Sequence, residues 1–557
     1  MAIIESYLAG ENSTALINKT IGQYLESIVE QYADHEAIVV THQGIRWNYR
    51  EYLQQIDRLA TGLLALGVEP GDRVGIWSPN NIQWSLTQFA TAKIGAIMVC
   101  INPAYGPYEL EYALKKVGCR VLITASEFKK SNYLEMLQQL APELAGAPSG
   151  KLRANKLPHL EIIIRMGNDV SLGMLNFDEV CNLGTDVEYE GLHRLHDSLR
   201  PEDPINIQFT SGTTGRPKGA VLSHHNILNN AYQVGLGMSL TAQDRLCIPV
   251  PLYHCFGMVL GNLTCMAHGA TAIFPGESFD PIQTLATVEI EKCTALHGVP
   301  TMFIAMLEDS IFESFDLSSL RTGVMAGATC PVELMKRVEN DMHMTNITVG
   351  YGQTETSPLN HMSSMDTTFE KRVSTVGRVV PHLEVKIINE QGKTVPIDNV
   401  GELCCRGYAV MQGYWDDEER TQETIDSEGW LYSGDLALMD SEGYVQIVGR
   451  IKDMIIRGGE NIYPREVEEF LYTHPYIQDV AVFGVDDAKY GEEVCVWIQT
   501  QEGKELTDEE IRTFCNGKIS HFKIPRYIRF VDSYPMTVTG KVQKYKMSEQ
   551  MNKALTY

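Results

Sequence analysis

The short segment Thr210-Ser-Gly-Thr-Thr-Gly-Arg-Pro-Lys-Gly219 gathers hydroxyl groups, glycines and a lysine into one turn. Glycine lets backbone N–H groups approach anionic oxygens closely, the hydroxyls add donors, and the Lys218 ammonium brings a compact positive charge. These groups suit the grip of a polyphosphate, so the segment predicts an ATP site. Its expected contacts are Thr210, Ser211, Gly212, Thr213, Thr214, Gly215 and Lys218.

The spacing of this segment differs from that of a Walker A loop, which needs a glycine, four residues and then Gly-Lys-Ser/Thr. Five residues after Gly212 and Gly215 the chain has a proline and an alanine. A flexible linker is the alternative, but residues 205–209 and 220–222 on either side are typical of strands. A loop held between two strands indicates a binding site.

Helical and strand-like segments, which must position this loop, alternate along the chain. Residues 52–66 have apolar side chains at helical spacing, and residues 73–77 and 120–124 are typical of strands. Such alternation predicts an α/β fold with parallel sheets flanked by helices. The large multilayer N-terminal domain is expected at residues 1–450.

The pattern changes after residue 450 to a small α+β unit. Residues 479–485, 493–500 and 527–531 are typical of strands, and residues 508–516 of a helix. A second domain is therefore predicted at residues 451–557. Two domains also suit the length of 557 residues, which exceeds what one core usually supports.

Composition excludes several classes of protein. The chain is 44% hydrophobic and 21% charged, as in ordinary globular proteins. Its formal net charge of −25 argues against nucleic acid as a partner, because neutralising phosphates takes a basic face. Anionic ligands must then be held by local donors.

Cysteine usage and apolar runs bear on the compartment. The 12 cysteines include no C-x-x-C pair, so neither a zinc site nor a disulfide framework is indicated, and packing in a reducing compartment is expected. The first residues do not resemble a signal or transit peptide. The longest apolar stretches, 89–99 and 256–266, are short for a membrane span and interrupted by polar residues or glycine. A cytoplasmic protein without an integral membrane segment is predicted.

Further motifs follow the phosphate segment in chain order. They are Pro251-Leu-Tyr-His254, Tyr351-Gly-Gln-Thr-Glu355, Tyr432-Ser-Gly-Asp435, Gly449-Arg-Ile-Lys-Asp453, Arg457-Gly-Gly-Glu-Asn-Ile-Tyr-Pro464 and Thr539-Gly-Lys541. Together they resemble the core motifs of the adenylate-forming superfamily of acyl-CoA synthetases, luciferases and peptide-synthetase adenylation domains. Within it the chain is most similar to medium-chain fatty-acyl-CoA synthetases, notably at residues 452–469 and 517–525. The resemblance implies a large N-terminal domain and a mobile C-terminal lid.

The resemblance also implies an activity. A carboxylic acid attacks ATP to give acyl-adenylate and pyrophosphate, the lid rotates, and the thiol of coenzyme A releases AMP. Since an anionic carboxylate must attack an anionic phosphate, neutralising charge and positioning carry most of such catalysis. The expected ligands are therefore ATP, Mg²⁺, coenzyme A and a small carboxylic acid.

Roles in the adenylation site follow from the matching motifs. Glu355 is a hard oxygen ligand suited to Mg²⁺, with the Thr210 hydroxyl nearby. Taken alone, Glu355 is better explained as a solvated surface residue, but its place beside the phosphate segment favours the metal role. Asp435 can accept two hydrogen bonds from ribose hydroxyls, with Arg450 at the same sugar, although a turn residue is the alternative for Asp435. The catalytic set implied is Lys541, Glu355, Thr354 and Lys218.

The resemblance implies an adenine slot, with the small residues of Ala326-Gly-Ala-Thr329 on one side and the Tyr351 ring stacked on the other. A core tyrosine is the competing interpretation of Tyr351. The remaining ATP contacts implied are Gly327, Ala328, Thr329, Gly352, Gln353 and Thr354.

The C-terminal motifs imply parts for both half-reactions, with the lysine motif serving adenylation and the glycine loop serving thioester formation. Pro535-Met-Thr-Val-Thr-Gly-Lys541 matches the family pattern whose lysine bridges ATP and the acyl carboxylate. Gly458, Gly459 and Glu460 are similar to the loop that lines the pantetheine channel, where glycine leaves room for a thin thiol arm. Lys452 matches the hinge about which the lid turns, although a surface charge is the alternative.

An acyl pocket is expected after the phosphate segment. Taken alone, His254 is more often a core residue than a catalyst, and the resemblance places it at the mouth of the pocket as a wall or gate. Gly257 and Gly261 are four apart and would share one face of a helix, leaving space for an acyl chain. That face is the predicted start of the tunnel.

Rival functions can be separated by cheap observations. A peptide-synthetase-like module would need an amino-group-binding aspartate where this chain has Tyr253-His-Cys-Phe256, and a carrier domain after Lys541. A luciferase-like oxygenase would consume oxygen, and a regulatory nucleotide-binding protein would have no use for both Glu355 and Lys541. The acid, expected to be a medium-chain fatty acid, and the oligomeric state, with a homodimer among the options, stay open.

Overall fold

The computed structural model describes residues 4–210, 217–328, 330–458, 460–536 and 542–555. The chain divides into two compact units. The larger comprises residues 9–384 and 405–431, and the smaller comprises residues 1–8, 385–404 and 432–557. Because the smaller unit draws on three stretches of chain, this division does not test a boundary at residue 451, which stays a prediction.

An eight-stranded sheet in the larger unit carries the phosphate segment. Its strands, in spatial order, are β10 (Leu175–Asn176), β9 (Ile162–Arg165), β6 (Val121–Thr124), β4 (Arg73–Trp77), β5 (Ile97–Cys100), β11 (Pro204–Thr210), β12 (Lys218–Ser223) and β22 (Gly413–Tyr414). Pairing is parallel from β10 to β11 and antiparallel at β12 and β22. Strands β5, β6 and β9 are buried along their whole length, as expected where both faces of a parallel sheet are covered.

A nine-stranded sheet forms the other half of the larger unit. In spatial order its strands are β19 (Arg378–Val379), β18 (Leu359–Met362), β17 (Asn346–Gly352), β16 (Thr322–Ala326), β15 (Ala295–Leu296), β13 (Arg245–Cys247), β14 (Thr271–Phe274), β2 (Glu36–Val40) and β3 (Ile45–Asn48). The strands from β17 to β2 are parallel, and antiparallel strands close both edges. The predicted α/β class with parallel sheets is confirmed.

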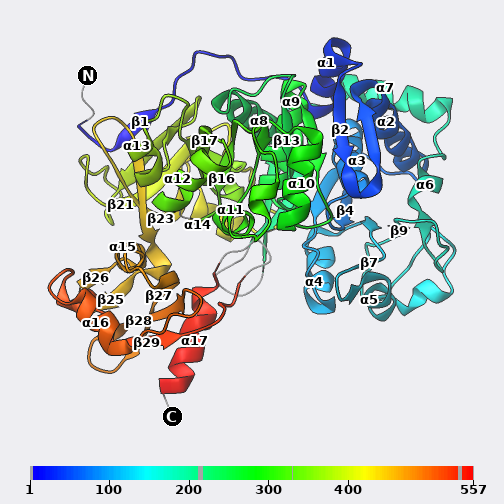
Figure 1. The fold of residues 1–557 in the computed structure, drawn as a ribbon. Coiled ribbons are helices and arrows are strands. Elements are labelled where there is room, and N and C mark those ends of the chain that lie inside the picture. The colour runs from blue at the N-terminus through cyan, green and yellow to red at the C-terminus, as the bar shows by residue number, and fades with distance from the viewer. Residues whose placement is uncertain (1–3, 211–216, 329, 459, 537–541, 556–557) are drawn as a thin grey trace. The chain divides into compact units, whose positions relative to one another are not determined.

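Helices cover these sheets (Figure 1). They are α1 (Ile21–Tyr32), α2 (Tyr49–Ala65), α3 (Ile82–Ile94), α4 (Pro107–Val117), α5 (Tyr133–Leu140), α6 (Phe177–Val180), α7 (Asp186–Ser198), α8 (His224–Gly237), α9 (Thr264–His268), α10 (Pro281–Glu291), α11 (Pro300–Leu307), α12 (Val332–Asp341), α13 (Phe369–Ser374) and α14 (Glu418–Thr424). The helix predicted at residues 52–66 is α2, which begins earlier because Asn48 and Glu51 form a capping box. Helices α1, α2 and α3 lie side by side.

Helix α3 is buried on all sides, including its one lysine. Lys93 lies 2.7 Å from Glu26 Oε1 and 2.6 Å from Asp57 Oδ1. A buried ammonium is tolerated only when it is paired and hydrogen-bonded, so these two carboxylates of α1 and α2 fix how the three helices pack.

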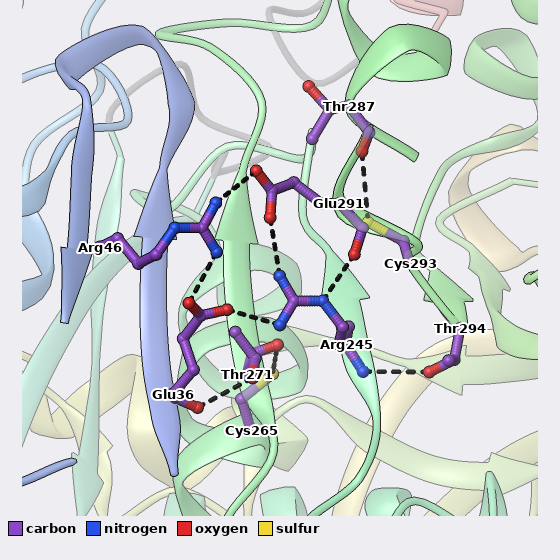
Figure 2. A network of polar contacts seen from close by, with 9 residues as sticks. All are labelled: Glu36, Arg46, Arg245, Cys265, Thr271, Thr287, Glu291, Cys293 and Thr294. Carbon is purple, nitrogen blue, oxygen red and sulfur yellow. Dashed lines mark hydrogen bonds and ion pairs between the residues drawn. The ribbon is translucent and has the colours of Figure 1, made fainter. Parts of the chain in front are cut away.

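An ion-pair ring ties the β2–β3 edge of the nine-stranded sheet to its interior (Figure 2). Arg46 on β3 and Arg245 on β13 each contact both Glu36 and Glu291, with N–O distances of 2.5–2.7 Å. Each carboxylate therefore joins two guanidinium groups. The ring links β2, β3, β13 and the end of α10.

The smaller unit contains two sheets. One has the order β1 (Tyr7–Ala9), β20 (Leu383–Ile388), β21 (Gly401–Gly407), β23 (Leu431–Met439) and β24 (Val445–Arg450), with a few end residues in the larger unit. The other consists of β26 (Glu460–Ile462), β25 (Ile455–Arg457), β28 (Gly491–Thr500), β27 (Ile477–Asp487) and β29 (Tyr527–Phe530). Helices α15 (Pro464–Leu471), α16 (Asp508–Cys515) and α17 (Lys544–Leu555) accompany it. The strands and helix predicted for this region are confirmed as β27, β28, β29 and α16.

None of the helices in the described part of the chain is long and apolar enough to cross a membrane.

Candidate active site

The two strands that flank the phosphate segment form an antiparallel hairpin. Strands β11 and β12 pair along their length, and the last pair in register is Thr210 with Lys218. The hairpin therefore fixes both ends of the predicted loop, as expected. The predicted contacts Ser211, Gly212, Thr213, Thr214 and Gly215 lie outside the described residues.

Glu355 lies at this end of the hairpin. It belongs to a single turn of 3₁₀-helix, Thr354–Thr356, and only 8% of its surface is exposed. The Thr210 hydroxyl donates a hydrogen bond to Glu355 Oε1 at 3.2 Å, and the Met411 N–H donates to the Glu355 carbonyl at 2.9 Å. The structure thus brings together the two side chains predicted to hold a metal ion.

The donor chemistry of this pair fits Mg²⁺. Magnesium prefers oxygen ligands and is usually held by one or two carboxylates together with substrate phosphates and water. Glu355 supplies one carboxylate and Thr210 one hydroxyl. Within the described ranges, no group of three or more His, Cys, Asp or Glu side chains could hold a metal ion by itself.

Tyr414 is a site residue that the sequence did not single out. Its hydroxyl donates to Glu355 Oε1 at 2.8 Å and accepts from Lys218 Nζ at 3.0 Å, and Lys218 Nζ lies 4.3 Å from the centre of its ring. The tyrosine projects from β22, which pairs with β12 beside the phosphate segment. One phenol therefore contacts two of the predicted catalytic residues.

The predicted adenine slot lies at the carboxyl edge of the nine-stranded sheet. Ala326 on β16 and Gly350 on β17 are in register, so Gly327, which follows β16, and Tyr351, near the end of β17, lie at the same edge of the sheet. Gly327 has φ of +90°, a conformation that favours glycine. Ligands of α/β sheets commonly bind at this edge. Ala328 follows in the same exposed loop, and Thr329 lies outside the described residues.

The turn that presents Glu355 needs the residues around it. A Cβ on Gly352 would lie 1.9 Å from the Pro358 carbonyl oxygen, so only glycine fits there. The Gln353 N–H donates to Thr356 Oγ1 at 3.1 Å and starts the 3₁₀ turn. Thr354 and Glu355 are both buried. Gly352, Gln353 and Thr354 thus shape the turn, and their contacts with ATP stay predictions.

The expected acyl tunnel beside Gly257 and Gly261 needs a correction. Residues Phe256–Leu263 form a π-helix, in which residues four apart still share one face. A Cβ on Gly257 would lie 2.3 Å from the Pro251 carbonyl oxygen, and one on Gly261 would lie 2.9 Å from Ile248 Cγ2. The space that these glycines were predicted to leave is filled by neighbouring chain, so they serve close packing.

His254 precedes this helix. Its Nδ1 accepts a hydrogen bond from the Phe256 N–H at 3.2 Å, which satisfies one of the first backbone donors of the π-helix. This contact is local and does not indicate that His254 acts as a catalytic base. Its predicted part as a wall or gate of the acyl pocket stays a prediction.

The predicted ribose pair lies in the smaller unit. Asp435 on β23 and Arg450 on β24 are partners in register, and Arg450 Nε donates to Asp435 Oδ1 at 3.1 Å. Glu402, which the sequence did not single out, accepts from the Gly434 N–H at 3.0 Å. Burial raises the pKa of Glu402, and the charge of Asp435 raises it further.

The residues predicted for the coenzyme A channel and the hinge also lie in the smaller unit. Lys452 is exposed in a short 3₁₀ turn, Ile451–Asp453. The Gly458 N–H donates to the Tyr490 carbonyl at 2.8 Å, and its φ of +59° favours glycine. Glu460 is exposed at the start of β26. Gly459 and Lys541 lie outside the described residues, and all these roles stay predictions.

Known proteins are similar to this chain in sequence. The AMP-binding enzyme family matches residues 25–415, and its C-terminal domain matches residues 466–541. The chain is 48% identical to YngI of Bacillus subtilis (strain 168), over 96% of the chain and 97% of YngI. It is 46% identical to the mitochondrial medium-chain acyl-CoA ligase ACSF2 of Danio rerio, over 99% of the chain and 91% of that protein.

A solved structure resembles the whole chain. The anthranilate CoA ligase AuaEII in complex with anthranoyl-AMP has a TM-score of 0.84 at 27% identity, covering 97% of this chain and 98% of that one. With the fold and the phosphate-loop hairpin described above, these matches define the class of protein. The chain belongs to the AMP-binding enzyme family.

Proposed function

We propose that the protein is an ATP-dependent ligase that joins a medium-chain fatty acid to coenzyme A. The acid carboxylate attacks the α-phosphate of ATP, which gives acyl-adenylate and releases pyrophosphate. The thiol of coenzyme A then attacks the acyl carbon and releases AMP. The observation that carries the proposal is the meeting of Thr210, Lys218 and Glu355 at the end of one hairpin.

Each group has a part in the first half-reaction. The Lys218 ammonium neutralises phosphate charge, and the hairpin holds its backbone in place. When bound, Mg²⁺ would be held by Glu355 and Thr210 and would supply further positive charge at the phosphates. Lys541 is proposed to bridge ATP and the acid, and Asp435 with Arg450 to hold the ribose.

The substrate class rests on likeness to the Danio rerio ligase, which is named for medium-chain acids. The proposed location is the cytoplasm, which cell fractionation would test against the mitochondrial location in that relative's name.

Binding of a linear acyl chain gains roughly 0.8 kcal/mol for each buried CH₂ until the pocket ends. Catalytic efficiency should therefore rise with chain length and then level or fall.

The test is a panel of straight-chain acids from acetate to hexadecanoate, with anthranilate added, assayed for AMP release in the presence of coenzyme A. We expect the highest kcat/KM between hexanoate and decanoate. An optimum at acetate or at anthranilate would reject the substrate class. Absence of acid-dependent AMP release with every acid would reject the ligase function.

A further inference from the structure

We propose that Tyr414 is a positioning residue, whose hydroxyl holds the Glu355 carboxylate in place for the metal ion and keeps the Lys218 ammonium off that carboxylate. This inference rests on the proposed function, since it concerns how the same site binds metal and ATP. Tyr414 lies about two hundred residues after Lys218, and sequence motifs did not connect the two.

The contacts fix a direction for the hydrogen bonds. An ionised carboxylate can only accept and an ammonium can only donate, so the single phenol proton must point to Glu355 while Lys218 donates to the phenol oxygen. The phenol is therefore a stable bridge with one defined orientation.

The bridge determines how the carboxylate is presented. The hydroxyls of Thr210 and Tyr414 both donate to the same oxygen, Oε1 of Glu355. Two donors on one oxygen restrict rotation of the carboxylate and direct Oε2 elsewhere. A carboxylate held this way loses less conformational entropy when it binds a cation.

The bridge also separates two opposite charges. Without the phenol oxygen between them, the flexible Lys218 side chain could reach Glu355 and form a direct ion pair. Such a pair would occupy the ammonium needed by phosphate and the carboxylate needed by metal. With Tyr414 present, Lys218 Nζ instead lies over the aromatic ring, which attracts a cation by its quadrupole.

The backbone around Tyr414 is held strongly enough for a positioning residue. Its own N–H donates to Thr421 Oγ1 at 2.9 Å. On either side, the Gln412 N–H donates to the Val221 carbonyl at 2.9 Å and the Trp415 N–H to the Gly219 carbonyl at 2.8 Å. Strand β22 thus ties the tyrosine to the same strand that begins with Lys218.

The test compares Tyr414→Phe with Tyr133→Phe. Tyr133 is also buried in the larger unit, and its hydroxyl donates to the Pro103 carbonyl at 2.6 Å, away from Glu355. Each variant thus loses one hydroxyl from a buried ring. The first readout is the affinity for Mn²⁺, measured by electron paramagnetic resonance in the presence of a non-hydrolysable ATP analogue. The second is the Mg²⁺ dependence of acid-dependent ATP–pyrophosphate exchange.

We expect Tyr414→Phe to weaken Mn²⁺ binding roughly tenfold, the effect of losing one hydrogen bond to a charged group, and to raise the half-saturating Mg²⁺ concentration similarly. Attack of coenzyme A on supplied acyl-adenylate should be retained. Tyr133→Phe should leave both metal readouts unchanged. In a Glu355→Gln background, Tyr414→Phe should cause no further loss of Mn²⁺ affinity, because the two residues act together.

Unchanged Mn²⁺ binding and Mg²⁺ dependence in Tyr414→Phe would overturn the inference, and so would an equal change in Tyr133→Phe or a full additional loss in the Glu355→Gln background. A wild-type protein without acid-dependent exchange would instead reject the proposed function. In that case the Mn²⁺ titration still tests whether Tyr414 positions Glu355, so failure of this inference can be distinguished from failure of the proposed function.

Discussion

Asp435 and Arg450 face each other on neighbouring strands, with Arg450 Nε donating to Asp435 Oδ1 at 3.1 Å. Only 5% of the Asp435 surface is exposed. A carboxylate so enclosed keeps one orientation, because the guanidinium fixes one of its oxygens. The pair is therefore organised before any ligand arrives.

We expect Asp435→Ala to raise the KM for ATP by about tenfold to a hundredfold, because hydrogen bonds from two ribose hydroxyls to a charged group are lost. ATP–pyrophosphate exchange at varied ATP measures this. The matched control is Asp440→Asn, since Asp440 caps the turn of the same hairpin by accepting from the Glu442 and Tyr444 N–H groups. An unchanged KM in Asp435→Ala would contradict the ribose role.

Lys541→Ala should abolish acyl-adenylate formation while largely retaining attack of coenzyme A on supplied acyl-adenylate. The loss should be on the order of a hundredfold or more, because a positive charge at the transition state is removed. Separate assays of the two half-reactions measure it, with the exposed Lys553→Ala as control. Equal losses in both half-reactions would show that Lys541 is not specific to adenylation.

Gly459→Leu should slow thioester formation more than adenylation, since the added side chain would enter the proposed pantetheine passage. Pyrophosphate exchange should survive while release of acyl-CoA falls. Gly146→Leu is the control, because that glycine is exposed and a Cβ there meets nothing within 4 Å. If Gly459→Leu impairs both assays equally, the passage lies elsewhere.

Gly261→Ala should destabilise the larger unit by about 1–3 kcal/mol, because the new methyl group must displace Ile248 from a packed core. Thermal unfolding measures the effect, and Gly146→Ala is the control. Adding Ile248→Val should restore part of the lost stability by removing a methylene. A Gly261→Ala protein as stable as wild type would show that the site has room after all.

The ion-pair ring should make stability sensitive to acid. Burial opposes ionisation of Glu36, but hydrogen bonds from Arg46 and Arg245 outweigh it and lower the pKa of that carboxyl. Its contribution is thus present above the unfolded pKa of about 4.3 and is lost as the pH falls through the lower folded value. Glu36→Gln should lower the unfolding temperature at neutral pH and reduce its dependence on pH between the folded and unfolded pKa values of Glu36. The exposed Glu30→Gln should change neither, and a Glu36→Gln protein with the wild-type pH profile would contradict the assignment.

Local patterns predicted much of the fold. The strand at Arg73–Trp77 has the predicted bounds, and the phosphate segment lies between two strands as expected. Tyr414 escaped prediction because β22 is two residues long and pairs with a strand far away in sequence. The space predicted beside Gly261 is filled by Ile248, which helical periodicity does not reveal.

The path of the chain between its two units has a consequence for modularity. The backbone passes from one unit to the other after residues 8, 384, 404 and 431. No single crossover between homologous genes could therefore transfer the smaller unit whole, because residues 385–404 and 1–8 would stay behind. Chimeras with a relative should work best when all three stretches come from the same parent.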